Sequence, residues 1–473
     1  MRRWLVCGLL AWLPGSAVAD LPPSVAQALL QVGIPESHVA IVVQDIGSAV
    51  SLLAHGEQHA FNPASVMKLL VTLAALDSLG PAYTFKTRVL LDGTLSDGVL
   101  QGNLILQGGG DPALTLERFW LLLREIHARG VREIRGDVIL DDRYYQLAPI
   151  DPGAFDQAPL RPYNAPPNAL LVNFNSLHLR LRSTPNTIDA QFDPVPVGGQ
   201  LPLINQLQAN DKRCNGWRDA IKPIIDSGMV LLTGSYPSAC GEQSLWLNLL
   251  APEATVATLF GSLWQDLGGR HGGQIRIGPT PAEARVLLEF NSPPLAQLVR
   301  DINKFSNNVM TKMLFLNLGA QHHGPPATWD KSTAALMSWL AKIGIEIPEL
   351  VIENGSGLSR IERISAASLA RLLAYAATRP AYYEFAASLP AVGLEGTQKG
   401  RTDESSATGM AWLKTGSLNG ARNLAGYVLG PDGRRRILVI LINHANAAAA
   451  GNAHTALVEW AVQQASESNF QAN

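Results

Sequence analysis

A serine and a lysine three residues apart have the side chains needed for nucleophilic chemistry. Ser65 and Lys68 stand in residues 61–70, where an asparagine and a proline precede an apolar run, as is typical of a helix N-terminus. The spacing puts both side chains on one face of the expected helix. A neutral lysine amine in reach of a hydroxyl can take its proton and make the serine a nucleophile. The pair alone is weak evidence, because a helix start with a solvated lysine gives the same pattern.

Two later motifs make the pattern more specific. Ser306 and Asn308 form a Ser-x-Asn in a helical region, and Lys414, Thr415 and Gly416 form a Lys-Thr-Gly at the end of an expected strand. Ser-x-Asn alone is uninformative, whereas Lys-Thr-Gly occurs once in the chain. The ordered trio of Ser-x-x-Lys, Ser-x-Asn and Lys-Thr-Gly is typical of penicillin-binding proteins and class A β-lactamases.

The chain as a whole resembles the class C low-molecular-mass penicillin-binding proteins. These are exported D-alanyl-D-alanine carboxypeptidases and endopeptidases of the penicillin-binding protein 4 type. The resemblance covers roughly residues 25–445 and includes residues 63–68, 108–112, 168–175, 355–360 and 393–397. The family often has an aspartate just before Gly-Ser-Gly-Leu-Ser, where this chain has Glu353 and Asn354.

The resemblance implies the fold class, α/β (α+β). It implies a serine β-lactamase/transpeptidase-like domain, an antiparallel sheet flanked by helices, with large nested insertion domains. Ser65 and Ser306 lie 241 residues apart (306 − 65), which leaves room for one or two such domains. The expected division is a signal peptide at 1–19, a catalytic domain at 20–92 and 289–473, an insertion domain at 93–165 and 243–288, and a second insertion nested in it at 166–242.

Hydrophobic periodicity predicts the main elements. We expect helices at 116–129, 254–267, 299–318, 329–343, 369–377 and 454–464, and strands at 39–43, 50–53, 138–140, 411–415, 423–429 and 437–443. Ser365 is the expected N-cap of the helix at 369–377. Asp141 and Asp142 are interpreted as a solvated turn at a strand end rather than as a paired-carboxylate site.

By the same resemblance, Ser65 attacks the carbonyl between two D-alanines and forms an acyl-enzyme. Lys68 is the expected base, and the neighbouring charge of Lys414 would lower its pKa because like charge disfavours the ammonium form. Ser306 relays a proton to the leaving amine. Asn308 holds the substrate amide and Lys68. These four residues, Ser65, Lys68, Ser306 and Asn308, are the catalytic candidates.

The substrate-binding candidates follow each other on one strand. They are Lys414, Thr415, Gly416 and Ser417. Lys414 and Thr415 suit a terminal carboxylate, and Gly416 lets the substrate approach the strand. The backbone N–H groups of Ser65 and Ser417 would form the oxyanion hole.

The N-terminus and the cysteines indicate export. Residues 1–19 contain two arginines, a short apolar run and an Ala-x-Ala end, which predicts a secretory signal peptide and a periplasmic location. The mature chain keeps Cys214 and Cys240, which lie 26 residues apart (240 − 214). In an exported protein an isolated pair predicts a disulfide, with two free buried thiols as the alternative.

Composition excludes several classes of function. The 473 residues are 47% hydrophobic and 16% charged, which is typical of a globular protein. The formal net charge is −2 with no basic block, so no nucleic-acid partner is expected. No apolar run after the signal is long enough to span a membrane. No cofactor or metal is expected, because His55 and His59 have no third ligand at a recognisable spacing.

The sequence therefore predicts a serine D-alanyl-D-alanine carboxypeptidase and endopeptidase. Its expected partners are peptidoglycan stem peptides as substrates and β-lactams as covalent inhibitors. The first alternative is a serine β-lactamase, which would need a fast deacylating base that the sequence does not show. The second is an inactive peptidoglycan-binding scaffold, which the three chemically complete motifs disfavour. The oligomeric state, the role of the insertions and the balance of the two activities stay open.

Overall fold

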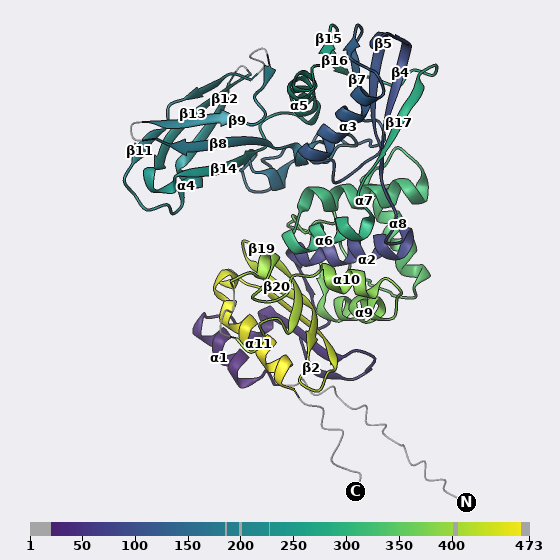
Figure 1. Cartoon of the computed structure of the whole chain (residues 1–473). Coiled ribbons are helices and arrows are strands. Elements are labelled where there is room, and N and C mark those ends of the chain that lie inside the picture. The colour runs from purple at the N-terminus through teal and green to yellow at the C-terminus, as the bar shows by residue number, and fades with distance from the viewer. Residues whose placement is uncertain (1–19, 185–186, 198–200, 227, 401–404, 465–473) are drawn as a thin grey trace, which may run out of the picture.

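The two ends of the chain build one half of the molecule and the middle of the chain builds the other. The computed structural model describes residues 20–184, 187–197, 201–226, 228–400 and 405–464, so the expected signal peptide lies outside the described residues. In Figure 1 the N-terminal and C-terminal parts lie together at the bottom, and the strands of the middle segment lie at the top. Within the described ranges, no helix is both long and apolar enough to cross a bilayer.

The lower half is organised around a five-stranded sheet. Its strands are β1 (Val39–Asp45), β2 (Ser51–His55), β19 (Ala411–Leu418), β20 (Ala421–Leu429) and β21 (Arg435–Asn443). The order is β19-β20-β21-β1-β2, with every neighbouring pair antiparallel. The antiparallel sheet agrees with the expected fold class, and β19 is an edge strand.

Both faces of this sheet are covered, which explains why β21 is apolar at nearly every position. Because successive side chains point to opposite faces, Val439 and Leu441 join one core and Leu438 and Ile440 join another. Helices α1 (Pro23–Gln31) and α11 (Gly451–Gln463) cover the second face. The other face is covered by a helical layer of α2 (Lys68–Leu79), α6 (Leu295–Phe305), α7 (Asn308–His323), α8 (Trp329–Lys342), α9 (Ala366–Ala377) and α10 (Tyr382–Ser388).

Several helices differ from the sequence prediction. The single helix expected at 299–318 is two helices, because Ser306 adopts a left-handed conformation (φ 58°) that ends α6, and Asn307 then caps α7. Helix α1 was not predicted. The cap of α9 was predicted correctly, since the Ser365 side chain accepts from the Ser368 N–H at 3.1 Å.

The upper half begins with a seven-stranded mixed sheet. It contains β4 (Lys86–Ser96), β5 (Val99–Gly108), β6 (Glu133–Ile134), β7 (Val138–Asp141), β15 (Arg270–His271), β16 (Ile275–Ile277) and β17 (Arg285–Asn291). Helices α3 (Leu116–Ala128) and α5 (Pro252–Asp266) bury their apolar faces in the same core as the sheet.

Further strands extend the upper half (Figure 1). One sheet has the order β14 (Glu242–Leu247), β8 (Leu177–Ser183), β9 (Ile188–Phe192). The other joins β10 (Leu203–Asn205), β11 (Gln208–Asn210), β12 (Ile221–Asp226) and β13 (Met229–Pro237), with the short helix α4 (Trp217–Ala220) beside it. A two-stranded sheet of β3 (Ala60–Phe61) and β18 (Ile364–Ser365) lies in the lower half.

The expected domain boundaries stay a prediction, but three strands cross them. β4 crosses residue 92, β17 crosses residue 288 and β14 crosses residue 242. Each is hydrogen-bonded into a single sheet on both sides of the expected boundary. The sequence pattern cannot show this, because periodicity does not reveal which strands pair.

The disulfide predicted between Cys214 and Cys240 is present, with the two Cα atoms 4.8 Å apart. Cys240 is part of a core that includes Trp217 and Tyr236, and Cys214 packs against that core. In the chain-entropy picture, closing a loop of this length stabilises the fold by about 3 kcal/mol.

We expect the double variant Cys214→Ser, Cys240→Ser to lower the free energy of unfolding of the upper half by about 2–4 kcal/mol. The rate of acylation by penicillin should stay at the wild-type value. Calorimetry and acylation kinetics on the same preparation measure both effects. Two alkylatable thiols in denatured, unreduced wild-type protein would contradict the assignment.

The two halves meet at the glycine run in residues 108–110. A Cβ on Gly110 (φ 77°) would lie 2.3 Å from the Asn317 Oδ1 of α7, and one on Gly109 would lie 2.2 Å from the Lys86 carbonyl. The glycine run therefore allows close packing of backbone and helix.

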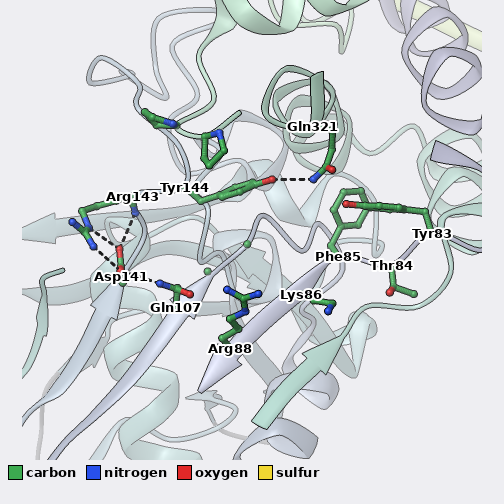
Figure 2. Close-up of a pocket in the computed structure, with 14 residues that line it drawn as sticks. Tyr83, Thr84, Phe85, Lys86, Arg88, Gln107, Asp141, Arg143, Tyr144 and Gln321 are labelled. Carbon is green, nitrogen blue, oxygen red and sulfur yellow. Dashed lines mark hydrogen bonds and ion pairs between the residues drawn. The ribbon is translucent and has the colours of Figure 1, made fainter. Parts of the chain in front are cut away.

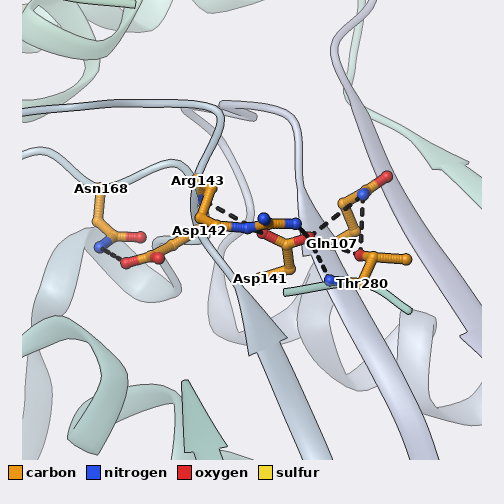
Figure 3. Close-up of polar contacts among 6 residues, drawn as sticks. All are labelled: Gln107, Asp141, Asp142, Arg143, Asn168 and Thr280. Carbon is orange, nitrogen blue, oxygen red and sulfur yellow. Dashed lines mark hydrogen bonds and ion pairs between the residues drawn. The ribbon is translucent and has the colours of Figure 1, made fainter. Parts of the chain in front are cut away.

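Asp141 corrects the expectation of a solvated turn, because it is buried and fully bonded (Figure 3). It accepts from Arg143 Nε at 2.9 Å, from Arg143 Nη2 at 3.0 Å, and from the Thr280 hydroxyl at 2.6 Å. Burial alone would raise the pKa of Asp141, but these hydrogen bonds lower it well below its usual range. Asp142 points to the other side and accepts from Asn168 at 2.8 Å. The two carboxylates have separate structural partners.

Candidate active site

Ser65 lies in a 3₁₀ turn, Ala64–Met67, which runs directly into α2 at Lys68. Asn62 Oδ1 accepts from the Ala64 N–H at 2.9 Å, but the cap position of the turn is Pro63 rather than Asn62 as the sequence pattern indicated. The tight turn keeps Ser65 and Lys68 on one side, and Lys68 Nζ is 3.0 Å from Ser65 Oγ. This is within the reach that proton transfer requires.

Lys68 is fully buried and held from three directions. Besides Ser65, its Nζ donates to Asn308 Oδ1 at 2.6 Å and to the Ser356 carbonyl. Burial lowers the pKa of Lys68 well below its usual range, and the charge of Lys414 lowers it further. The lysine is thereby suited to be a neutral base at the pH where ordinary lysines are charged.

Ser306 and Lys414 form the second half of the cluster. The left-handed conformation of Ser306 turns its side chain out of the helix end, where its Oγ accepts from Lys414 Nζ at 2.8 Å. Lys414 also donates to the Thr415 carbonyl at 2.8 Å. Burial lowers the pKa of Lys414 to about 7. Near neutral pH this group can therefore exist in both protonation states.

The edge strand β19 carries the four substrate-binding candidates. The Thr415 and Thr397 hydroxyls are 2.9 Å apart, and Ser417 is exposed further along the strand. A Cβ on Gly416 would lie 2.5 Å from the Pro63 carbonyl. Gly416 was expected to let the substrate approach the strand. In the structure, the atoms that a side chain at this position would meet belong to residues 63–66, at the turn that carries Ser65.

All three motifs thus converge on one site, although they are spread over 350 residues of sequence (65 to 414). Among known proteins, the D-Ala-D-Ala carboxypeptidase 3 (S13) family matches residues 21–464. The chain belongs to the S13 family of serine D-Ala-D-Ala carboxypeptidases.

The chain is also similar to individual proteins and solved structures. The chain is 28% identical to a D-alanyl-D-alanine carboxypeptidase of Actinomadura sp. strain R39, over 93% of this chain and 84% of the relative. Penicillin-binding protein 4 of Haemophilus influenzae has a similar fold, with a TM-score of 0.77 at 23% identity, covering 93% of this chain and 99% of the other. A predatory endopeptidase of Bdellovibrio bacteriovorus is more distant, with a TM-score of 0.53 at 14% identity, covering 90% and 93%.

This S13 carboxypeptidase contains charged residues near the site that the sequence analysis missed, and Glu362 is one of them. Glu362 is fully buried, and its Oε1 accepts three backbone N–H groups, from Glu353 at 3.1 Å, Asn354 at 3.0 Å and Gly355 at 2.9 Å. Ser356, which follows Gly355 in this loop, supplies the carbonyl that accepts from Lys68 Nζ. Glu362 therefore anchors the loop that holds the expected base. Glu362 stands between Ile361 and Arg363, and a lone glutamate in such a stretch gives no sequence signal of burial.

Asn354 stands where the family often has an aspartate, and it organises the same loop. Its Oδ1 accepts from the Ser356 N–H at 3.0 Å and from the Ser356 hydroxyl at 2.5 Å. Both are acceptor roles that an aspartate carboxylate would also fill. A Cβ on Gly357 (φ 78°) would lie 1.9 Å from the Ala64 carbonyl, so this loop packs directly on the turn of Ser65.

The upper half of the molecule also reaches the site. Asn308 Nδ2 donates to the Tyr163 carbonyl at 3.4 Å, and the Arg360 guanidinium lies 4.3 Å from the centre of the Phe155 ring. Residues 155–163 therefore lie beside the catalytic cluster. The resemblance assigned no site residue to this segment.

Proposed function

We propose that Ser65 is the nucleophile of D-alanyl-D-alanine cleavage and that Lys68 is its base. The observation that carries this proposal is the buried Lys68 amine at 3.0 Å from Ser65 Oγ, with its pKa lowered by burial and by Lys414. Lys68 takes the hydroxyl proton while Ser65 Oγ bonds to the carbonyl carbon of the penultimate D-alanine. The backbone N–H groups of Ser65 and Ser417 hold the oxyanion.

The second half of the cluster completes the reaction. The C–N bond breaks as the leaving amine takes the proton that Lys68 removed from Ser65, relayed through the hydroxyl of Ser306, whose Oγ is 2.8 Å from Lys414 Nζ. Water then attacks the acyl-enzyme ester, giving the shortened peptide and free Ser65. Penicillin would acylate the same hydroxyl, and the related H. influenzae protein has been solved with a β-lactam bound.

The same site fits two substrates. Lys414 and Thr415 suit a free carboxylate beside the scissile bond. In a stem pentapeptide this is the carboxylate of the terminal D-alanine. In a D-alanyl–diaminopimelate cross-link the D-configured centre of the leaving amine carries an equivalent carboxylate. One acyl-enzyme therefore accounts for carboxypeptidase and endopeptidase activity. The N-terminal signal pattern supports action in the periplasm.

We expect Thr415→Val to lower kcat/KM by about tenfold on both pentapeptide and cross-linked dimer, because one hydrogen bond to the carboxylate is lost while side-chain shape is kept. Thr94→Val, at an exposed position of β4, is the matched control and should leave both values unchanged. Steady-state kinetics on the two purified substrates measure the effect. Loss of one activity alone would show that the substrates do not share this carboxylate site.

Fluorescent-penicillin labelling together with muropeptide digestion tests the proposal against its alternatives. A β-lactamase would turn over penicillin rapidly and leave pentapeptide intact. An inactive scaffold would bind peptidoglycan without forming an adduct. The proposed enzyme forms a slowly hydrolysed adduct and releases D-alanine.

A further inference from the structure

A cavity is lined by residues of both halves of the molecule and by none of the catalytic candidates (Figure 2). Its volume is about 660 Å³, within the usual range of small-molecule sites. It is lined by the segment leading into β4, the ends of β5 and β7, and the turn after α7. Helix α7 connects it to the catalytic cluster: Asn308 begins the helix, and Gln321, 13 residues on, lines the cavity, about 20 Å away at 1.5 Å per residue.

The cavity has aromatic walls on two sides. Tyr83 and Phe85 form an edge-to-face pair with ring centres 5.1 Å apart. Tyr144 lies on the opposite side, where its hydroxyl accepts from Gln321 Nε2 at 3.1 Å (Figure 2). Rings placed in this way offer flat apolar surfaces with polar groups at their edges.

The polar groups of the cavity include an excess of donors. Lys86 Nζ and Arg88 Nε both bind the one carboxylate of Glu289, at 2.7 and 2.9 Å, so two cations share one anion. The third cation, Arg143, is neutralised by Asp141. The side chains of Lys86 and Arg88 are 50% and 49% exposed. Within the described ranges, the terminal nitrogens of Arg88 donate to no protein acceptor. One positive charge and several N–H groups therefore face solvent.

We propose that this cavity is a second substrate-binding site, which takes an acidic muropeptide segment of the wall polymer. An amino-sugar ring would pack on the aromatic walls, and a stem-peptide carboxylate would bind Lys86 and Arg88. This inference rests on the proposed function, because it assumes that the enzyme acts on peptidoglycan. A stem of five residues extends at most about 18 Å, which is similar to the distance of about 20 Å along α7. The D-alanyl end of a stem at Ser65 therefore does not itself reach this cavity, and the segment bound here is a different part of the polymer.

The chemistry favours this occupant over a neutral glycan. A carboxylate gains charge-assisted hydrogen bonds from a guanidinium, and the amide groups of Gln107 and Gln321 can pair with acetamido and hydroxyl groups. A neutral sugar would leave the excess cation without a partner. The site would retain the polymer near the enzyme while the catalytic cluster cuts one stem after another.

The test uses the full mature protein acylated with benzylpenicillin, so that the catalytic cluster is blocked. The probe is a disaccharide-tripeptide, which lacks the scissile D-alanyl-D-alanine bond, and binding is measured by titration calorimetry. We expect Arg88→Gln and Tyr144→Leu each to weaken binding by about tenfold. The matched control is Arg276→Gln, an ion-paired arginine of the same sheet that lies outside the cavity and is 46% exposed.

Unmodified enzymes are then compared on two substrates. Arg88→Gln should raise KM on intact sacculi and leave kcat/KM on a soluble pentapeptide unchanged. Absence of probe binding to the acylated wild type, or equal binding by wild type and Arg88→Gln, would overturn the inference. Equal affinity for chitotetraose, which has no carboxylate, would also overturn it. Failure of the proposed function would be seen separately, as loss of pentapeptide hydrolysis by the wild type.

Discussion

Ser65→Ala is expected to abolish formation of the covalent penicillin adduct and to lower kcat on pentapeptide by roughly 10⁴-fold or more, as removal of a nucleophile does in other serine hydrolases. The fold should be unaffected. Ser65 is only partly buried, and the contact of its hydroxyl that the structure describes is with Lys68. Alanine is compatible with the 3₁₀ turn of Ala64–Met67. Intact-protein mass spectrometry after incubation with benzylpenicillin measures the adduct directly.

Ser306→Ala is the matched control, because it removes another hydroxyl of the same cluster. Ser306 bonds to Lys414 and has no bond to the acylated atom in the proposed mechanism. The Ser306 variant should therefore still form the adduct, at a reduced rate. An adduct of wild-type mass on Ser65→Ala would contradict the assignment of the nucleophile.

The sequence was sufficient to predict which residues gather at the site, since Ser-x-x-Lys, Ser-x-Asn and Lys-Thr-Gly each constrain local geometry. It did not predict how Ser306 reaches Lys414, because the left-handed residue between α6 and α7 leaves no clear break in an otherwise helical pattern. The sheet strands 411–415, 423–429 and 437–443 were found from their apolar runs, but each is longer in the structure, at Ala411–Leu418, Ala421–Leu429 and Arg435–Asn443.

Residues whose role depends on partners distant in sequence could not be predicted from the sequence alone. Glu362 is recognisable only after the loop at 353–357 has been placed on Lys68. Asp141 was expected to be solvated because it lies at a strand end, whereas one of its partners, Thr280, is 139 residues away in sequence. Burial of a charged residue depends on such distant partners, and a local pattern contains no information about them.

Glu362→Gln is expected to move the acid limb of the pH–rate profile for acylation to lower pH, by about one unit or more. Lys68 must be neutral to act as the base. Its charged neighbours are Lys414 and Lys312, which lower its pKa, and Glu362, which raises it. Removing the carboxylate charge lowers the pKa of Lys68 further, so the neutral form appears at lower pH. Glutamine keeps an acceptor oxygen for the three N–H groups of the loop.

This shift requires that Glu362 is ionised in the folded protein. Burial raises the pKa of Glu362, while the three backbone N–H bonds and the charge of Lys68 oppose that change. The basic limb provides an internal reference. Burial alone lowers the pKa of Lys414 to about 7, so a limb that reports loss of the Lys414 charge should stay in place in the variant.

Glu349→Gln separates this electrostatic effect from a loss of stability. Glu349 also anchors a buried segment, since its Oε1 accepts from the Ser365 N–H at 3.2 Å and from the Ser368 hydroxyl at 2.5 Å. Glu349 is not among the charges that act on Lys68. Both variants should lower the melting temperature, and only Glu362→Gln should move the acid limb. If stopped-flow acylation between pH 5 and 9 gives the same acid limb for wild type and Glu362→Gln, then Glu362 stabilises the loop at 353–357 without setting the proton affinity of Lys68.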